Sequence, residues 1–198
     1  MAGRFRADID AFFGSEAALV EFGGRLSGWR LWRHVVPQLV LNPGFLSVAL
    51  YRTSRWFWLR DHQIVSRLIN RFTELVCGIQ IDADSDFGPG LEIHHPQGVV
   101  MSPKMKIGSN MVIIGAAVTF GIRDIENDPF SQSIEIGDNV TIATGAKVLG
   151  PIVIGDNVKI GPNVVLMQDV PSDSIVIVGE RPKIISTKKP PASAGQAA

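Results

Sequence analysis

The chain has 198 residues, with 19 basic and 19 acidic side chains, so its formal net charge is zero. This length fits one compact core. The composition, with 45% hydrophobic and 19% charged residues, excludes a disordered chain. A neutral chain lacks the basic surface of a dedicated nucleic-acid binder. A single cysteine, Cys77, excludes an internal disulfide framework and a multi-cysteine metal site, and it favours a reducing, cytoplasmic setting.

Charge and composition change abruptly near Gly78. Residues 1–78 hold ten Arg, no Lys and six acids, which gives +4, whereas residues 79–198 hold two Arg, seven Lys and thirteen acids, which gives −4. All four Trp precede this point and 18 of the 21 Ile follow it. The change predicts the main architectural boundary here.

Residues 1–77 are predicted to form an α-helical N-terminal segment. From Phe45 to Cys77 there is no Pro or Gly, and apolar residues recur at helical spacing, which indicates continuous helix. Pro43–Gly44 before this stretch and Gly78 after it are helix boundary signals. A shorter helix is predicted within 11–35, interrupted by glycines.

A six-residue repeat occupies the following part of the chain. From Ile136, every sixth residue is a branched apolar anchor, and the residue four positions after each anchor is small or β-branched. The anchors are Ile136, Ile142, Val148, Ile154, Ile160 and Leu166, and their partners are Val140, Ala146, Ile152, Val158, Val164 and Val170. Earlier anchors are predicted at Ile81, Phe87, Ile93, Val99, Ile107, Ile113 and Thr119, with Met111 and Ala117 as small partners. Two extra residues are placed around Ser102–Pro103, and a polar insertion over 121–133.

This period predicts a mainly β fold, a left-handed parallel β-helix of about five coils preceded by the helical segment. A short strand alternates its faces every two residues and a turn follows it, so stacked six-residue units build three-sided coils. Gly and Asn suit corners that require a positive φ. The β-helix is predicted over 78–185, with a disordered tail over 186–198.

Two adjacent histidines interrupt the repeat, in the segment GPGLEIHHPQGVV. Because Ile93 is the inward anchor, His94 and His95 are predicted at an outward strand end or corner. Histidine is the side chain best suited to move a proton near neutral pH, so a general base is one interpretation. Two ordinary surface histidines on a turn are the other.

The pattern GxGLxIxHxxGVV, followed by the coils, the polar insertion and TGAKVLGPIVIGDNVKIGPNVVLMQDVP, resembles the serine acetyltransferases, which are hexapeptide-repeat acyltransferases. The resemblance spans residues 78–185. It implies acetyl transfer from acetyl-CoA, as co-substrate and without a metal, to a hydroxyl group. It implies His95 as the general base, with backbone N–H groups that stabilise the oxyanion.

The resemblance also implies where the substrates bind. His94 falls where the family often has an acidic residue that touches the acceptor. Lys159 would serve a CoA phosphate, and Lys183 matches a basic residue near the end of the fold. The cofactor-binding residues that the resemblance implies are Thr144, Gly145, Lys159, Gly161 and Lys183.

Three positions depart from the family pattern and leave the acceptor open. Gln80 stands where the family has an Asp that orients the base, with Asp82 or Asp84 as possible substitutes. Ser131 replaces a second histidine, and Phe130 replaces the arginine before it. Gln80 and Ser131 are therefore acceptor-binding candidates with altered chemistry. Both L-serine, as in cysteine biosynthesis, and a sugar hydroxyl, as in exopolysaccharide biosynthesis, stay open as acceptors.

The resemblance further implies a homotrimer or a dimer of trimers, with each site between two subunits. The aromatic and basic character of residues 45–77 permits contact with an anionic membrane surface, so a cytoplasmic or membrane-peripheral location follows. Alternatively, Trp56 and Trp58 pack on the β-helix or on a neighbouring subunit, and the arginines are solvated.

Two readings without acetyl transfer are also open. One is a non-catalytic β-helix scaffold. The other is a metal-dependent hydratase like the γ-carbonic anhydrases, which share this fold. That relative needs three histidines, and the β-helix here offers only His94 and His95, because His34 and His62 lie in the helical segment.

Overall fold

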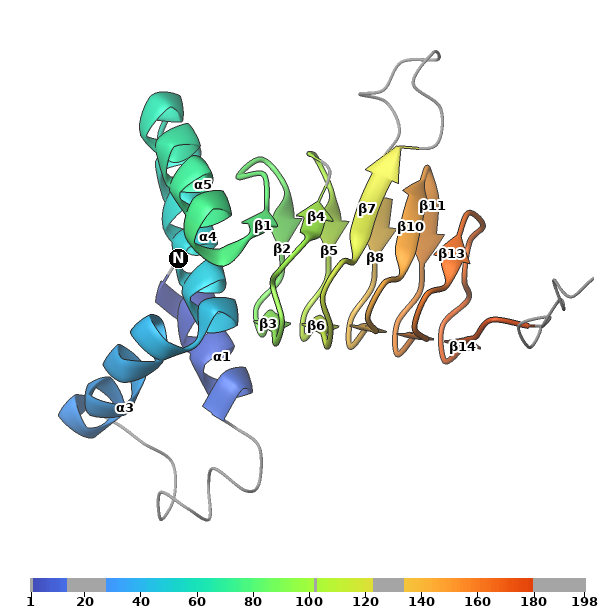
Figure 1. Ribbon diagram of the computed structural model, residues 1–198, viewed down its shortest axis with the longest axis horizontal. Coiled ribbons are helices and arrows are strands. Elements are labelled where there is room, and N and C mark those ends of the chain that lie inside the picture. Colours follow the sequence, from blue (N-terminus) through green and yellow to red (C-terminus); the bar gives the residue numbers. More distant parts are fainter. Residues whose placement is uncertain (1, 14–27, 102, 123–133, 180–198) are drawn as a thin grey trace, which may run out of the picture.

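The computed structural model describes residues 2–13, 28–101, 103–122 and 134–179, and shows helices followed by a row of stacked strands (Figure 1). The helices are α1 (Ala2–Phe13), α3 (Gly28–Leu41), α4 (Pro43–Trp58) and α5 (Gln63–Cys77). Within the described residues, no helix has the length and apolar character needed to cross a membrane. The predicted tail over 186–198 lies outside them.

Short parallel strands form three sheets, one for each side of the coil. Sheet A holds β1 (Ile79–Gln80), β4 (Val99–Met101), β7 (Thr119–Ile122), β10 (Lys147–Gly150) and β13 (Val165–Leu166). Sheet B holds β2 (Asp86–Phe87), β5 (Lys106–Ile107), β8 (Ile134–Ile136) and β11 (Ile152–Ile154). Sheet C holds β3 (Glu92–Ile93), β6 (Val112–Ile113), β9 (Thr141–Ile142), β12 (Lys159–Ile160) and β14 (Ile175–Val176). The strands form four complete coils and part of a fifth, which confirms the predicted parallel β-helix.

The repeat anchors form the core, as predicted, with one error of register. All twelve anchors and partners from Ile136 to Val170 are buried. Thr119 and Ala117, however, are not inward: Phe120 and Val118 are the buried residues of that strand. The turn after Ile113 is one residue longer than the corresponding turn after Ile142, so the fixed step of six points to the wrong face.

The two extra residues predicted around Ser102–Pro103 lie elsewhere. Met101 aligns with Phe120 and Val148 across sheet A, and Ile93 aligns with Ile113 and Ile142 across sheet C. Eight residues separate Ile93 from Met101, whereas six separate Ile142 from Val148. The expansion is therefore in the corner between sheets C and A, where His94 and His95 stand.

The corners between sheets B and C use the residue type that the repeat predicts. Asn110, Asn139 and Asn157 take left-handed φ values of 57°, 58° and 56°. The amide of Asn110 donates to Asn139 at 3.0 Å, and that of Asn139 donates to Asn157 at 3.1 Å. Asparagine tolerates this conformation, and the hydrogen bonds between its side-chain amides join consecutive coils. The repeated IGDNV sequence thus has a structural cause.

The predicted continuous helix over 45–77 is wrong. Instead, α4 ends at Trp58 and α5 begins at Gln63, and the two helices lie side by side as a hairpin (Figure 1). Asp61 in the connection takes a φ of 60°, which an Asp tolerates better than most residues, so the chain reverses without Pro or Gly. Gly78 caps α5 with a φ of 69°, and Gly28 begins α3 rather than interrupting a helix.

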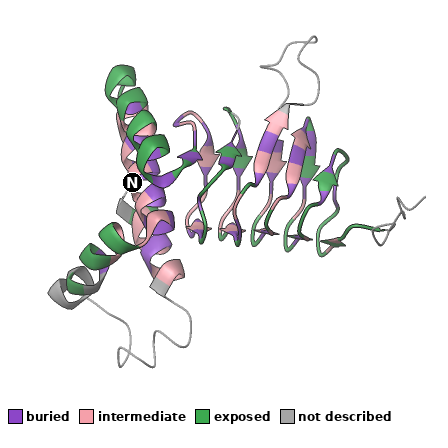
Figure 2. Ribbon diagram, viewed as in Figure 1, coloured by how far each residue is buried: buried purple, intermediate pink, exposed green. Residues whose placement is uncertain are grey.

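Helix α4 closes the open end of the β-helix, and buried residues line it where it meets the first coil (Figure 2). Tyr51 packs edge-on against Phe87 with 5.1 Å between ring centroids. Its hydroxyl donates to the Ser85 carbonyl at 2.7 Å and accepts from the Phe87 N–H at 3.3 Å. A Cβ at Gly44 would lie 1.8 Å from the Ile93 carbonyl oxygen, so only glycine permits this approach.

A buried ion pair fixes α1 and α4 to the same end. Arg52 Nε donates to Asp8 at 2.7 Å and Nη2 donates to its other oxygen at 2.9 Å, and the side chains are 3% and 0% exposed. Asp8 also accepts the backbone N–H groups of Gly90 and Leu91, each at 2.9 Å. The interpretation of solvated arginines is therefore wrong for Arg52.

We predict that Arg52→Met strongly destabilises the chain. The substitution keeps the apolar stem but leaves the Asp8 carboxylate buried without its cation, a loss of about 3–5 kcal/mol in such pairs. Urea unfolding followed by circular dichroism measures the change. Arg67→Met, at an exposed position of α5, is the matched control and should change stability by less than about 0.5 kcal/mol. Equal effects of the two substitutions would contradict a stabilising role for the pair.

Candidate active site

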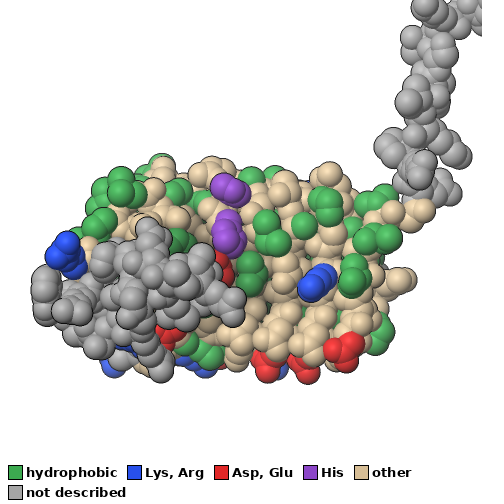
Figure 3. Space-filling view, turned by 90° about the horizontal axis from the view of Figure 1, so that it is seen from below, with side chains coloured by type: hydrophobic (Ala, Val, Ile, Leu, Met, Phe, Trp, Pro, Cys, Tyr) green, Lys and Arg blue, Asp and Glu red, His purple; other side chains and the backbone are tan. Residues whose placement is uncertain are grey.

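The two histidines project from the expanded corner between sheets C and A. His94 follows β3 directly, and both histidines are exposed. Figure 3 shows histidine side chains together on one face of the molecule, with hydrophobic side chains around them and few charged ones. The predicted outward placement of His94 and His95 agrees with the structure.

Backbone hydrogen bonds align this corner through successive coils. The His94 N–H donates to the Ile113 carbonyl, and at the next coil the Ile114 N–H donates to Ile142. The Ala143 N–H donates to Ile160 one coil further. Because each residue of the ladder has an equivalent on the next coil, His95, Gly115 and Thr144 follow one another along the corner. Neighbouring strands are about 4.8 Å apart, so Thr144 is about 10 Å from His95.

Gly115, between His95 and Thr144 on this corner, is buried, whereas His95 and Thr144 are exposed. A Cβ at Gly115 would lie 1.6 Å from Thr144 Oγ1, so this position excludes every residue but glycine. The Thr144 side chain therefore packs closely against the coil that precedes it on the same corner as the exposed His95 imidazole.

The structure brings most predicted cofactor residues to this corner or beside it. Thr144, Gly145 and Gly161 lie on the corner, and Lys159 is exposed on β12 of the adjoining sheet C. Beyond them, an open cavity of about 830 Å³ lies at the C-terminal coils. Its lining includes Asn163, Leu166, Met167, Ile177 and Val178. Lys183 lies outside the described residues.

Glu92 is a site residue that sequence reasoning missed. Its Oε1 lies 2.9 Å from His94 Nε2, and its side chain is 20% exposed. The signal was available, because residues two apart on a strand share one face and Ile93 between them points inward. A carboxylate at this distance holds the imidazole ring in one orientation.

His95 has no comparable partner in the part of the chain that the structure describes. Gln80 is exposed on β1, in register with Val100, and no hydrogen bond joins it to His95 there. Asp82 and Asp84 lie in the turn between β1 and β2, at a different corner of the coil, so neither orients His95 within one subunit. Phe130 and Ser131 lie outside the described residues.

Metal ligands are not grouped in the described ranges. There, no three His, Cys, Asp or Glu side chains gather in a way that could hold a metal ion. The chemistry that this corner itself offers is an exposed imidazole beside a carboxylate–imidazole pair.

Comparisons with known proteins fit this arrangement. The family model described as "Bacterial transferase hexapeptide (six repeats)" matches residues 133–168. The fold and the corner thus define a hexapeptide-repeat transferase. The serine acetyltransferase of Staphylococcus aureus is 41% identical over 177 residues, which cover 89% of this chain and 76% of that protein. The chain belongs to the serine acetyltransferase family, which confirms the resemblance.

Solved structures share this fold. A serine acetyltransferase of Neisseria gonorrhoeae in complex with serine matches with a TM-score of 0.71 and 26% identity, over 91% of this chain and 68% of that one. A serine acetyltransferase in complex with CoA matches with a TM-score of 0.70 over 87% and 65% of the chains, and at 23% identity it shows the shared fold alone. The chain spans 58% of the length of the curated relative from Synechococcus elongatus.

We predict that Asp82→Asn stabilises the chain at neutral pH. Burial, and then the neighbouring Asp84 carboxylate, raise the pKa of Asp82 above its usual 3.8. The folded state therefore binds more protons than the unfolded state, so stability falls as pH rises from 3.8 through the raised pKa.

Thermal unfolding at several pH values measures this effect. The asparagine variant should be more stable than the parent above that window and equal to it below. Glu74→Gln, an exposed change of the same charge, is the control. A variant that is less stable than the parent at pH 7 would show that the ionised carboxylate is favourable.

Proposed function

We propose that the chain is an acetyl-CoA-dependent O-acetyltransferase that acts on a small hydroxyl-bearing acceptor, with L-serine as the leading candidate. The observation that carries this proposal is the alignment of His95, Thr144 and the cavity lined by Asn163 along one corner of the β-helix. Membership of the serine acetyltransferase family supports the same reaction.

In the proposed reaction, His95 is the catalytic base. Its neutral imidazole accepts the proton of the acceptor hydroxyl as the oxygen attacks the thioester carbonyl of acetyl-CoA. Backbone N–H groups at the corner stabilise the tetrahedral oxyanion. When the intermediate collapses, the C–S bond breaks and the imidazolium returns its proton to the CoA thiolate. The products are an acetyl ester and free CoA.

The Glu92–His94 pair is proposed to position the acceptor. The Glu92 carboxylate is partly exposed beside the base, so it offers a negative charge to a cationic amino group. A free amino acid carries such a group and an ordinary sugar does not, which favours L-serine. Gln80 and Ser131, which differ from the family pattern, are the reason to keep a sugar hydroxyl as the second candidate.

Acetyl-CoA is proposed to lie along the corner towards the C-terminal coils. The pantetheine arm would follow the backbone at Thr144, Gly145 and Gly161, with Lys159 near a CoA phosphate. Membership of the serine acetyltransferase family supports acetyl-CoA as the co-substrate. The cavity of about 830 Å³ lies in the direction in which the arm would extend.

We predict that His95→Ala abolishes thiol release from acetyl-CoA. Loss of a general base lowers the rate by a factor of about 100 to 10,000. A thiol reagent follows CoA release with L-serine and with a panel of sugars and glycans. His62→Ala, an exposed histidine in the helical segment, is the matched control and should retain the parent rate.

The outcomes of this assay separate the candidates. Release that depends on serine and on His95 supports the proposal. Release with a sugar alone moves the protein to polysaccharide modification. If no acceptor gives release and the His95 variant equals the parent, the chain is a non-catalytic scaffold and the proposal fails.

For assembly, we propose a homotrimer, with trimers paired through α5. Its apolar residues Val65, Leu68, Phe72 and Leu75 recur at steps of three and four and are 40–78% exposed. This spacing is the seam that one helix presents to another. Arg67, Arg71 and Glu74 give α5 a net charge of only +1, which favours a second helix over an anionic membrane surface.

We predict that Leu68→Glu with Phe72→Glu splits paired trimers into single trimers. Buried charges would disrupt the apolar seam, and light scattering should report half the mass of the parent. Gln63→Glu, also exposed on α5, is the control. Sedimentation with anionic vesicles tests the alternative: membrane binding that only the double variant loses would replace the pairing proposal and make the protein membrane-peripheral. A parent that is neither paired nor vesicle-bound would contradict both.

A further inference from the structure

A cleft lined by arginines lies on the side of the molecule where α1 and α4 meet β2. It holds about 370 Å³, within the range of sites for small molecules. Its lining residues are Arg4, Arg52, Arg55, Trp56, Leu59, Arg60 and Asp86. The cleft belongs to sheet B and the helices, whereas His95 stands at the corner between sheets C and A, so the two sites are separate.

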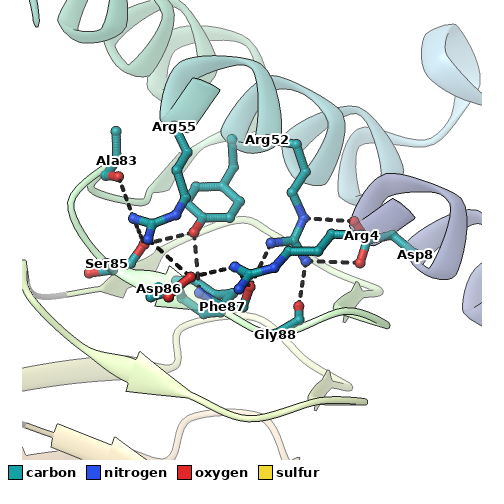
Figure 4. A network of polar contacts seen from close by, with 10 residues as sticks. Arg4, Asp8, Arg52, Arg55, Ala83, Ser85, Asp86, Phe87 and Gly88 are labelled. Carbon is teal, nitrogen blue, oxygen red and sulfur yellow. Dashed lines mark hydrogen bonds and ion pairs between the residues drawn. The ribbon is translucent and has the colours of Figure 1, made fainter. Parts of the chain in front are cut away.

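Positive charge in this cleft exceeds what its own carboxylates neutralise. Figure 4 shows three of the guanidinium groups converging on the first coil. Asp86 forms ion pairs with Arg4 and with Arg55, the latter at 3.0 Å. Asp8, which is not among the lining residues, forms an ion pair with Arg52. Four arginines and two carboxylates leave two positive charges.

Several N–H groups of these arginines have no partner among the described residues. Arg4 uses only Nη1, for Asp86 and the Phe87 carbonyl, so its Nε and Nη2 are available. Arg60 likewise uses only Nη1, for the Trp56 carbonyl. Guanidinium forks with free N–H groups suit the oxygens of a phosphoryl group, which they bind bidentately.

The cleft also has an apolar wall that is already ordered. The Arg60 guanidinium lies 3.9 Å from the centroid of the Trp56 indole, and Trp56 packs edge-on against Phe57. This cation–π contact holds Arg60 at the cleft before any ligand arrives. Leu59 beside it is 66% exposed, so an organic group can pack there.

We propose that this cleft binds a phosphomonoester, with the phosphoryl group between Arg4 and Arg60 and the organic part against Trp56 and Leu59. Two excess positive charges match a phosphomonoester, which carries about −1.5 to −2 at neutral pH, better than a single carboxylate. The ligand would bridge α1, α4 and β2, so it would stabilise the folded chain.

Calorimetry with adenosine monophosphate, inorganic phosphate and adenosine tests the proposal on the full chain. The first two probes should bind and adenosine should not, and affinity should fall as salt increases. Arg60→Ala should weaken binding of adenosine monophosphate by about tenfold, the loss of a charge-assisted contact. Arg67→Ala removes the same charge from an exposed position of α5 and should change nothing.

Further arms identify the ligand source and exclude the acetyl-CoA site. Phosphatidylcholine vesicles with and without phosphatidic acid test for a lipid phosphomonoester, and binding that Arg60→Ala abolishes would assign the site to a lipid headgroup. Lys159→Ala should leave binding of adenosine monophosphate unchanged. Binding lost in Lys159→Ala but retained in Arg60→Ala would overturn the proposal, as would equal affinities of the two arginine variants or no binding of any probe.

Discussion

The structure depends on how the exposed end of the first coil is closed. A parallel β-helix pairs each coil with its neighbours, but the first coil has an edge whose backbone groups face no further strand. Here α1 and α4 satisfy that edge with side chains: Asp8 accepts from two N–H groups, and Tyr51 serves one N–H and one carbonyl. Arg52 donates to the carbonyls of Phe87 and Gly88. Buried backbone groups left unpaired would be costly, so the helices and the β-helix form one folding unit.

This closure gives a structural role to three of the ten arginines in residues 1–78. The arginine-rich helical segment supplies guanidinium groups, which have donors but no acceptors, to an edge where carbonyl oxygens face outward. Arg55 adds bonds to the carbonyls of Ala83 and Ser85, where a lysine would offer only a point charge. Arg4, Arg52 and Arg55 make this contact, and their guanidinium groups fit its geometry.

The six-residue period predicts the fold well because its cause is local. Each anchor faces inward whenever the turn before it has the standard length, and Asn at the corners follows from φ. The period fails where a turn is longer, at Thr119 and at the histidine corner. It also carries no information about Asp8 and Arg52, which are 44 residues apart, or about the reversal at Asp61. Such contacts depend on how segments meet in space, and no spacing in the sequence encodes them.

The same reasoning explains what could be predicted of the candidate site. His95 stands out because a histidine pair interrupts a run of apolar and small residues. Glu92 could not be singled out in the same way, because a single acid on an outward strand position is common. Only the 2.9 Å distance between Glu92 Oε1 and His94 Nε2 identifies it as a site residue. A regular coil exposes the same flat ladder at every level. Function therefore requires departures from the repeat: the histidine corner has two added residues, and both histidines there are exposed. The regular coils keep these departures in fixed positions, because every neighbouring level is held by its own buried anchors.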